Sequence, residues 1–210
     1  DKNKLGYDHY NYYLQLRRMG QLEELNLGMY RVQMGMGLVM NTAFSLGKLA
    51  TLQSLGRTTH MLTANTSRSQ GDYLQGAAAT LRISSRWRLT AFASYRALDA
   101  TLNKDGTART LLRDGYHRTQ TELNKKNNTR ETDLGGSIGY RQGTFHFNMN
   151  MTYTHLNRQL IPQHVLYKRF AASGADFTNV SVDYGYNTAR WGVAGESAVN
   201  GYGVLATINT

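Results

Sequence analysis

The sequence contains no cysteine, a single proline and no long hydrophobic run. The absence of cysteine excludes a disulfide-stabilised scaffold and thiolate metal sites, although it does not identify the cellular compartment. No stretch approaches the roughly 18 apolar residues that a membrane-spanning helix requires, so helical spanning is excluded. Spanning by strands is not excluded, because each strand gives a much weaker hydropathy signal.

Signatures of catalysis are also missing. The six histidines are scattered, and no pair has the spacing of metal ligands beside a carboxylate, which argues against a zinc site. There is no Gly-x-Ser-x-Gly motif, and Gly135-Gly136 leads into a predicted strand rather than a phosphate-binding loop. We therefore expect no enzymatic activity, no cofactor and no metal.

Acidic residues are scarce relative to basic ones, with 14 Asp and Glu against 24 Lys and Arg, for a formal net charge of +10. This balance is compatible with nucleic acid, an anionic membrane surface or a basic pore lining as partner. A solvated basic surface gives the same balance, so charge alone does not separate these classes.

A strict alternation of apolar and polar residues is the clearest positive signal, and it covers residues 144–155. Successive side chains of a strand point to opposite faces, so this segment has one apolar face and one polar face. The apolar positions are Phe145, Phe147, Met149, Met151 and Tyr153, and the polar ones are His146, Asn148, Asn150, Thr152 and Thr154. Either a soluble sheet over a core or a membrane barrel with a wet lumen has this pattern.

Similar alternation recurs along the chain and predicts about nine strands of roughly ten residues, near the length of a tilted membrane strand. The predicted strands are 10–17, 25–34, 73–83, 87–97, 134–140, 144–155, 180–186, 191–193 and 204–208. The parity of the second strand slips near Gly28, which predicts a bulge there. Bacterial single-chain barrels have even strand numbers, so nine strands indicate an incomplete barrel.

The predicted connections alternate between short and long. Short links lie at Met19-Gly20, Ser84-Ser85, Gln142-Gly143 and Asn187-Thr188, and long ones at 35–70, 99–130 and 158–174. This alternation is typical of outer-membrane barrels, whereas a lipocalin-like soluble barrel fits such long loops poorly. Trp87, Phe145, Tyr186 and Trp191 adjoin the short links, as in an interfacial aromatic girdle, although aromatic residues are common in any sheet.

Charged side chains facing lipid at mid-depth cost a few kcal/mol, so charged residues of the strands should face the lumen or a rim. There they form either a ladder of ion pairs or the lining of an anion-attracting pore. The predicted lumen-lining residues are Arg31, Arg82, Arg88, Arg96, His146, Asn148, Asn150, Asp183 and Glu196.

Two loops carry further patterns. Apolar residues at 43–55 have helical spacing and predict a short amphipathic helix, either a plug in the barrel mouth or a docking helix. The loop at 99–130 is basic and could contact lipopolysaccharide phosphates, acidic glycans or, less readily, nucleic acid, or it could be a solvated loop. Its candidate contact residues are Arg109, Arg113, Arg118, Lys125 and Lys126.

The order of several short motifs resembles the barrel region of Bacteroidetes outer-membrane proteins that carry helix-hairpin-helix repeats. The motifs begin at Val32–Asn41 and Phe44–Lys48, continue through Gln75–Ala79, Tyr95-Arg96, His117–Thr119 and Lys125–Asn128, and end at Leu166–Arg169 and Asp176-Phe177. The resemblance implies location and fold more than activity. The helix-hairpin-helix part is not among these residues, so we expect a segment of a longer protein, and nucleic-acid uptake is an idea by analogy alone.

Together these patterns predict that residues 1–210 form a single segment of an antiparallel, up-and-down transmembrane β-barrel in a bacterial outer membrane, with long outer loops. A closing strand of such a barrel usually ends in an aromatic residue, whereas this sequence ends in Thr210. The expected partner is outer-membrane lipid, with lipopolysaccharide or an outer-membrane protein as further candidates. The expected function is a porin-like pore or translocation component for anionic cargo. The alternative is a structural or docking barrel whose loops bind a protein or surface polysaccharide.

Overall fold

The computed structural model describes residues 10–42, 61–66, 72–112, 117, 119–163, 165, 171–188 and 190–209. These residues form an all-β fold with one short helix. The strands are β1 Tyr13–Met19, β2 Leu22–Val32, β3 Leu62–Ala64, β4 Leu74–Arg82, β5 Trp87–Leu102, β6 Ala108–Leu112, β7 Thr129–Gln142, β8 Phe145–Leu160, β9 Gly174–Asn187, β10 Gly192–Asn200 and β11 Gly203–Asn209; the helix is α2, Gln120–Leu123.

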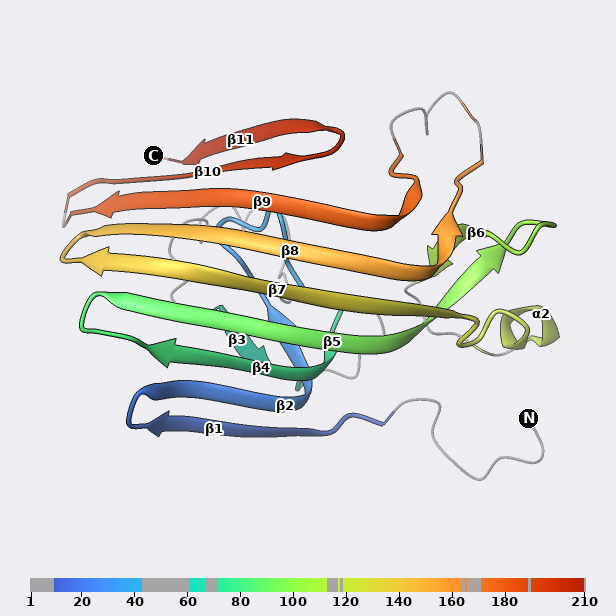
Figure 1. The fold of residues 1–210 in the computed structure, drawn as a ribbon, viewed down its shortest axis with the longest axis horizontal. Coiled ribbons are helices and arrows are strands. Elements are labelled where there is room, and N and C mark those ends of the chain that lie inside the picture. The colour runs from blue at the N-terminus through green and yellow to red at the C-terminus, as the bar shows by residue number, and fades with distance from the viewer. Residues whose placement is uncertain are drawn as a thin grey trace.

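Antiparallel pairing joins the strands in the order β1-β2-β4-β5-β7-β8-β9-β10-β11, an up-and-down meander (Figure 1). The short strand β3 pairs with β2, and β6 pairs with the end of β5 and touches β8 at one position. The predicted all-β meander is therefore confirmed. Within the described residues β1 and β11 do not pair with each other, so they form the two edges of the sheet.

The short turns lie together at one end of the sheet, and the β6 hairpin and α2 lie at the other (Figure 1). The four short turns are those between β1 and β2, β4 and β5, β7 and β8, and β9 and β10. A further short turn, centred on Gly201-Tyr202, joins β10 to β11 at the opposite end of β10. Asn200 ends β10, and its Oδ1 accepts hydrogen bonds from the backbone N–H groups of Tyr202 and Gly203.

The two faces of the sheet differ as the alternation predicts. On β8, Met149 and Met151 are more than half exposed, whereas Asn150 and Thr152 between and beside them are buried. Cross-strand register extends this difference over the sheet. One row runs Leu89, Ile138, Met149, Val182 across β5, β7, β8 and β9. The adjacent row on the other face runs Thr90, Ser137, Asn150, Ser181.

The predicted bulge at Gly28 is wrong, since Gly28 pairs in register with Tyr13 on one side and Gly76 on the other. The irregularity lies between Leu22 and Glu24 instead. From Glu24 to Val32, beyond that irregularity, the even-numbered side chains of β2 face the buried polar side of the sheet. The apparent slip arises because those positions change from polar to apolar after Gly28, where β2 leaves the wall and enters an apolar core.

That core lies on the concave face and is built around a segment that follows β2. Residues 32–42, here called the inner hairpin, close on themselves through the Gln33–Asn41 bridge and a bond from Met34 N to Met40 O of 3.0 Å. The core cluster comprises Tyr30, Val32, Met34, Leu62, Leu74, Ala78 and Phe92. Phe92 belongs to this cluster, which explains why an apolar side chain lies on the otherwise polar face of β5. The helix predicted at 43–55 lies outside the described residues.

Candidate functional site

A cavity of about 840 Å³ lies on the polar face of the sheet at the end of the short turns. We call it the short-turn cavity. The charged residues that line it are Arg17, Arg18, Glu23, Glu24, Arg82, Arg88, Arg141, His146 and Asp183. Polar strand residues, among them Thr90, Ser137 and Asn148, complete the wall, and Gly35 and Met36 of the inner hairpin close one side of the cavity.

Arginine outnumbers carboxylate around this cavity. Two of the five arginines are paired, since Arg88 Nε lies 2.8 Å from Glu23 Oε2 and Arg17 Nη2 lies 3.6 Å from Glu24 Oε1. The other three, Arg18, Arg82 and Arg141, have no carboxylate within ion-pair distance among the described residues, and Arg82 donates instead to the Gly20 carbonyl at 3.2 Å. The cavity therefore presents unpaired positive charge beside the short turns.

Arg18 reaches the cavity through an unusual backbone conformation. Its φ is +60°, a left-handed value that is uncommon for a residue other than glycine. Strict alternation assigns Arg18 to the face opposite Arg17, and the left-handed residue breaks that alternation so that both line the cavity. Sequence periodicity could not identify Arg18 for this reason. It could have identified Arg141, which shares a face with Ser137 and Gly139.

Two carboxylates lie together beside the inner hairpin. Asp183 on β9 and Glu196 on β10 are direct cross-strand partners, and both are buried. Asp183 accepts hydrogen bonds from Asn148 Nδ2 at 2.5 Å and Asn150 Nδ2 at 2.7 Å, while His146 Nε2 lies 4.0 Å away. Glu196 accepts from the backbone and from a Ser181 hydroxyl at 2.7 Å. Each buried charge is thus surrounded by donors, as burial requires.

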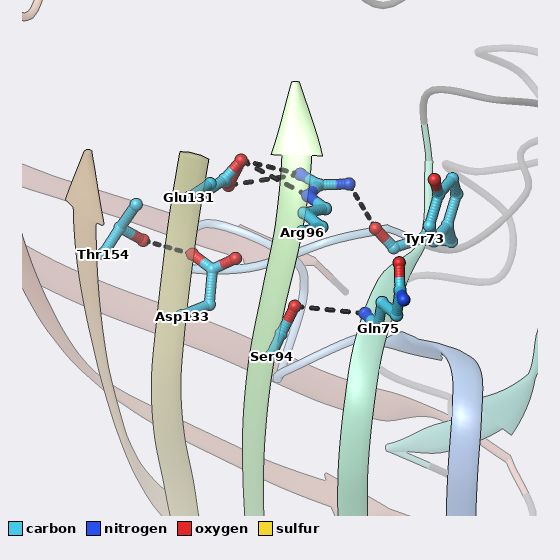
Figure 2. A network of polar contacts seen from close by, with 7 residues as sticks. All are labelled: Tyr73, Gln75, Ser94, Arg96, Glu131, Asp133 and Thr154. Carbon is cyan, nitrogen blue, oxygen red and sulfur yellow. Dashed lines mark hydrogen bonds and ion pairs between the residues drawn. The ribbon is translucent and has the colours of Figure 1, made fainter. Parts of the chain in front are cut away.

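A second polar network lies near the long-loop end of the same face (Figure 2). Arg96 on β5 contacts Glu131 on β7 through two nitrogens, with Nη2 lying 3.0 Å from Oε2, and it also donates to the Tyr73 carbonyl. Its guanidinium lies 5.7 Å from the centre of the Tyr73 ring. Burial raises the pKa of the Tyr73 phenol, and the positive charge of Arg96 opposes that shift. These contacts tie β4, β5 and β7 together and do not line the cavity.

The predicted lumen residues fall into two groups. Arg82, Arg88, His146, Asn148 and Asp183 line the short-turn cavity. Arg31, Arg96, Asn150 and Glu196 are buried away from its lining. Arg31 lies on the face of β2 opposite Tyr30 and Val32, and its Nε has no hydrogen-bond partner among the described residues. Arg31 therefore lies on the other face, whereas the remaining predicted lumen residues share the polar face, some in an open charged cavity and others in closed polar networks.

The predicted loop contacts lie at the far end of the sheet. Arg109 is exposed on β6, and Lys125 and Lys126 follow α2, while Arg113 and Arg118 lie outside the described residues. Side chains order this region. Asp99 Oδ1 accepts from Asn127 N at 2.7 Å, and Arg158 donates to the carbonyls of Gly106 and Asn128, each at 2.8 Å.

The turn between β5 and β6 is likewise closed by a side chain. Hydrogen bonds from the Thr107 hydroxyl and backbone N–H lower the pKa of the exposed Asp105 carboxyl. The far-end loop, residues 99–130, is accordingly ordered by side-chain hydrogen bonds where the structure describes it, and it carries basic residues at its surface.

Aromatic side chains form a band on the exposed face near the short turns. Register places Trp87, Tyr140, Phe147 and Tyr184 in one row across β5, β7, β8 and β9. The rings of Trp87 and Tyr140 have centroids 5.0 Å apart, and those of Tyr186 and Trp191 are 6.3 Å apart. Sequence position places Trp87 and Trp191 beside short turns, and in the structure Trp191 extends the band through its ring contact with Tyr186, which pairs with Phe145.

Within the described ranges, no group of three or more His, Asp or Glu side chains is arranged to hold a metal ion. No helix in that part of the chain has both the length and the hydropathy to cross a membrane. Comparison with known proteins adds no relative, because no family model, curated protein or solved structure matches the chain.

Proposed function

We propose that this chain forms part of the wall of an outer-membrane β-barrel, with the exposed face toward lipid and the polar face toward the lumen. The observation that carries the proposal is the apolar exposed face, on which Leu134, Ile138, Met149 and Met151 are each about half exposed. A contiguous apolar surface of this size is unfavourable in water and marks contact with a membrane or another protein. We favour lipid, because lipid would cover the apolar face without any partner protein.

The dimensions of that face suit a bilayer. Along β5, the outward residues between Trp87 and Tyr95 are Leu89, Ala91 and Ala93. Eight residues of strand span about 26 Å along the strand axis before correction for tilt. Outer-membrane barrels have an apolar band of about 25 Å flanked by aromatic girdles. The aromatic band at Trp87 is the counterpart of one girdle, and Tyr95 and Tyr153 lie at the height of the other.

Open sheet edges in lipid carry unsatisfied backbone groups at several kcal/mol each, so membrane sheets close into barrels. We therefore propose that the edges β1 and β11 pair with further strands in the assembled protein. The curl of the sheet favours closure, because the inner hairpin that follows β2 contacts Glu196 on β10 across the concave face.

The cargo that suits the lumen is anionic. Arg18, Arg82 and Arg141 line the short-turn cavity without carboxylate partners among the described residues. Clefts with an excess of one sign of charge concentrate the opposite ion and speed its entry, and arginines exceed carboxylates in this lining. Planar guanidinium groups bind carboxylate and phosphate oxygens well. The proposed function is a pore or translocation wall for anionic cargo.

The test is ion selectivity in planar bilayers, measured on the protein in its native assembly. The triple variant R18Q, R82Q, R141Q removes the unpaired cavity charge and should shift the chloride-over-potassium permeability ratio toward 1. The matched control R86Q, R190Q removes charge from exposed short-turn residues outside the cavity lining. The proposal fails if no conductance is seen or if both variants keep the original ratio.

A docking barrel is the second candidate, and the ordered far-end loop favours it. Its basic residues Arg109, Lys125 and Lys126 lie on a framework held by Asp99 and Arg158. Purified lipopolysaccharide is the probe, because its phosphates match these cations. Binding that is lost in R109Q, K125Q, K126Q, together with absent conductance, selects docking over transport.

A further inference from the structure

We propose that the inner hairpin is a gate held shut by Glu196, and that its release opens the short-turn cavity toward the long-loop end of the lumen. The inference rests on the proposed pore function for its consequence, but the latch itself can be measured without conductance. The hairpin lies between two regions: its tip lines the cavity, and its base joins the apolar core beyond.

The latch consists of one carboxylate and two backbone N–H groups. Glu196 Oε2 accepts from Met36 N at 2.7 Å and from Leu38 N at 3.1 Å, although Glu196 lies 160 residues along the chain from Met36. Its other oxygen accepts from the Ser181 hydroxyl, which orients the carboxylate. Glu196 is 0% exposed, so these bonds are shielded from solvent. Bonds to an ionised acceptor in such surroundings are roughly twice as strong as neutral ones.

The fit at the tip depends on a glycine. Gly35 has φ of +51°, and a Cβ placed on it would lie 2.9 Å from Glu196 Cδ and 3.0 Å from Asp183 Cβ. The backbone of the tip therefore sits directly against the two wall carboxylates. Gly37, with φ of +93°, allows the chain to turn back immediately afterwards.

The two ends of the hairpin are held to different degrees. At the base, Val32 and Met34 are fully buried in the core, and Thr42 N bonds to Val32 O at 2.9 Å. At the tip, Met36 is buried, but Leu38 and Val39 are only half-buried. Local opening begins where few apolar contacts hold the chain, so the tip can leave while the base remains. Among the described residues, Glu196 is the side chain that holds the tip by hydrogen bonds.

Release of the hairpin tip changes the charge that faces the lumen as well as the width of the opening. With the tip docked, the Glu196 charge is neutralised in part by two N–H dipoles. With the tip removed, Glu196 and its neighbour Asp183 face the lumen together. Anion preference should therefore decrease as the gate opens, and the open state should conduct more with less selectivity.

The latch is tested by cysteine accessibility, for which the chain is well suited because it contains no native cysteine. A single M36C reporter replaces a side chain that is 7% exposed. Its reaction with a water-soluble maleimide should accelerate about tenfold in E196Q and more in E196A, as expected for loss of charge-assisted bonds. The control E122Q changes a carboxyl on α2, where glutamine also serves in a capping box.

Equal labelling rates in E196Q and E122Q would overturn the latch. If E196A does not fold, E196Q and a tip replacement decide the question. In the replacement, residues 35–39 become Asn-Gly, which closes a two-residue hairpin between the paired Met34 and Met40. It should raise conductance severalfold and lower anion selectivity, and unchanged conductance in an active channel would overturn the gate. Faster labelling without any conductance would keep the latch and reject the pore.

Discussion

At the scale of single residues, the ion pairs on the polar face differ in how deeply they are buried. The Arg96 and Glu131 side chains are 9% and 11% exposed, whereas those of Arg88 and Glu23 are 42% and 28% exposed. Arg96 and Glu131 have lost most of their hydration, so each depends on the other's charge. Arg88 and Glu23 remain in contact with solvent. The two pairs should therefore contribute very differently to stability.

Substitution R96M leaves Glu131 buried without its cation and should lower the free energy of unfolding by about 3–5 kcal/mol. The double variant R96M, E131L removes the stranded charge and should recover most of that loss. Urea unfolding in detergent micelles measures both. For comparison, R88Q at the exposed pair should cost no more than about 1 kcal/mol. A loss in R96M no larger than that in R88Q would contradict this account.

At the scale of the element, one strand carries two environments. In β8 the exposed residues Phe145, Phe147, Met149 and Met151 alternate with residues that are buried or line the cavity. Because successive side chains point to opposite faces, adjacent positions report on the two sides of the wall. Lipid on one side and water on the other is the arrangement proposed here.

Fluorophores attached to single cysteines at Met149 and Asn148 should respond differently to a lipid-phase quencher. M149C should be strongly quenched in vesicles, because its side chain is 54% exposed on the apolar face. N148C should be quenched weakly, since Asn148 lines the short-turn cavity. Water-soluble iodide should give the reverse order. Equal quenching by the lipid-phase agent at both positions would rule out the proposed orientation.

At the scale of the whole molecule, the sheet is a continuous antiparallel wall with its short turns at one end and its longer connections at the other (Figure 1). Antiparallel neighbours satisfy each other's backbone groups along most of the length of β5, β7, β8 and β9. A wall of this kind resists local opening, since backbone bonds broken in a bilayer find no water to replace them.

The protein should accordingly be extracted from membranes by detergent alone, and it should migrate differently in SDS gels before and after boiling. A folded barrel of the proposed kind would retain its compact form in SDS until heat disrupts the sheet, which is the reason for the expected shift. High salt should not release it, because the binding is apolar rather than electrostatic. Recovery in the aqueous phase without detergent would contradict the membrane proposal.

Much of the fold follows from local sequence. A period of two residues in segments such as 144–155 predicts a two-faced strand wherever it lies, and short links between such segments predict antiparallel neighbours. The cavity residues Arg82, Arg88, His146 and Asn148 could be assigned to the polar face from parity alone. The two-faced strands, their antiparallel order and the face of each of these side chains all depend on residues that are close together in the sequence.

The inner hairpin could not be assigned in this way. The change of parity near Gly28 predicts a bulge, because alternation does not reveal that β2 leaves the wall there and that Tyr30, Val32 and Met34 enter a core. Arg18 reaches the cavity through one left-handed residue, which periodicity does not encode.

The alternation by itself therefore determined a wall with an apolar and a polar face. Tertiary structure alone decided what lies against the polar face, because the contact between Glu196 and the Gly35–Leu38 tip joins residues about 160 positions apart. Such a contact depends on how the sheet curls, and the curl is a property of all its strands together.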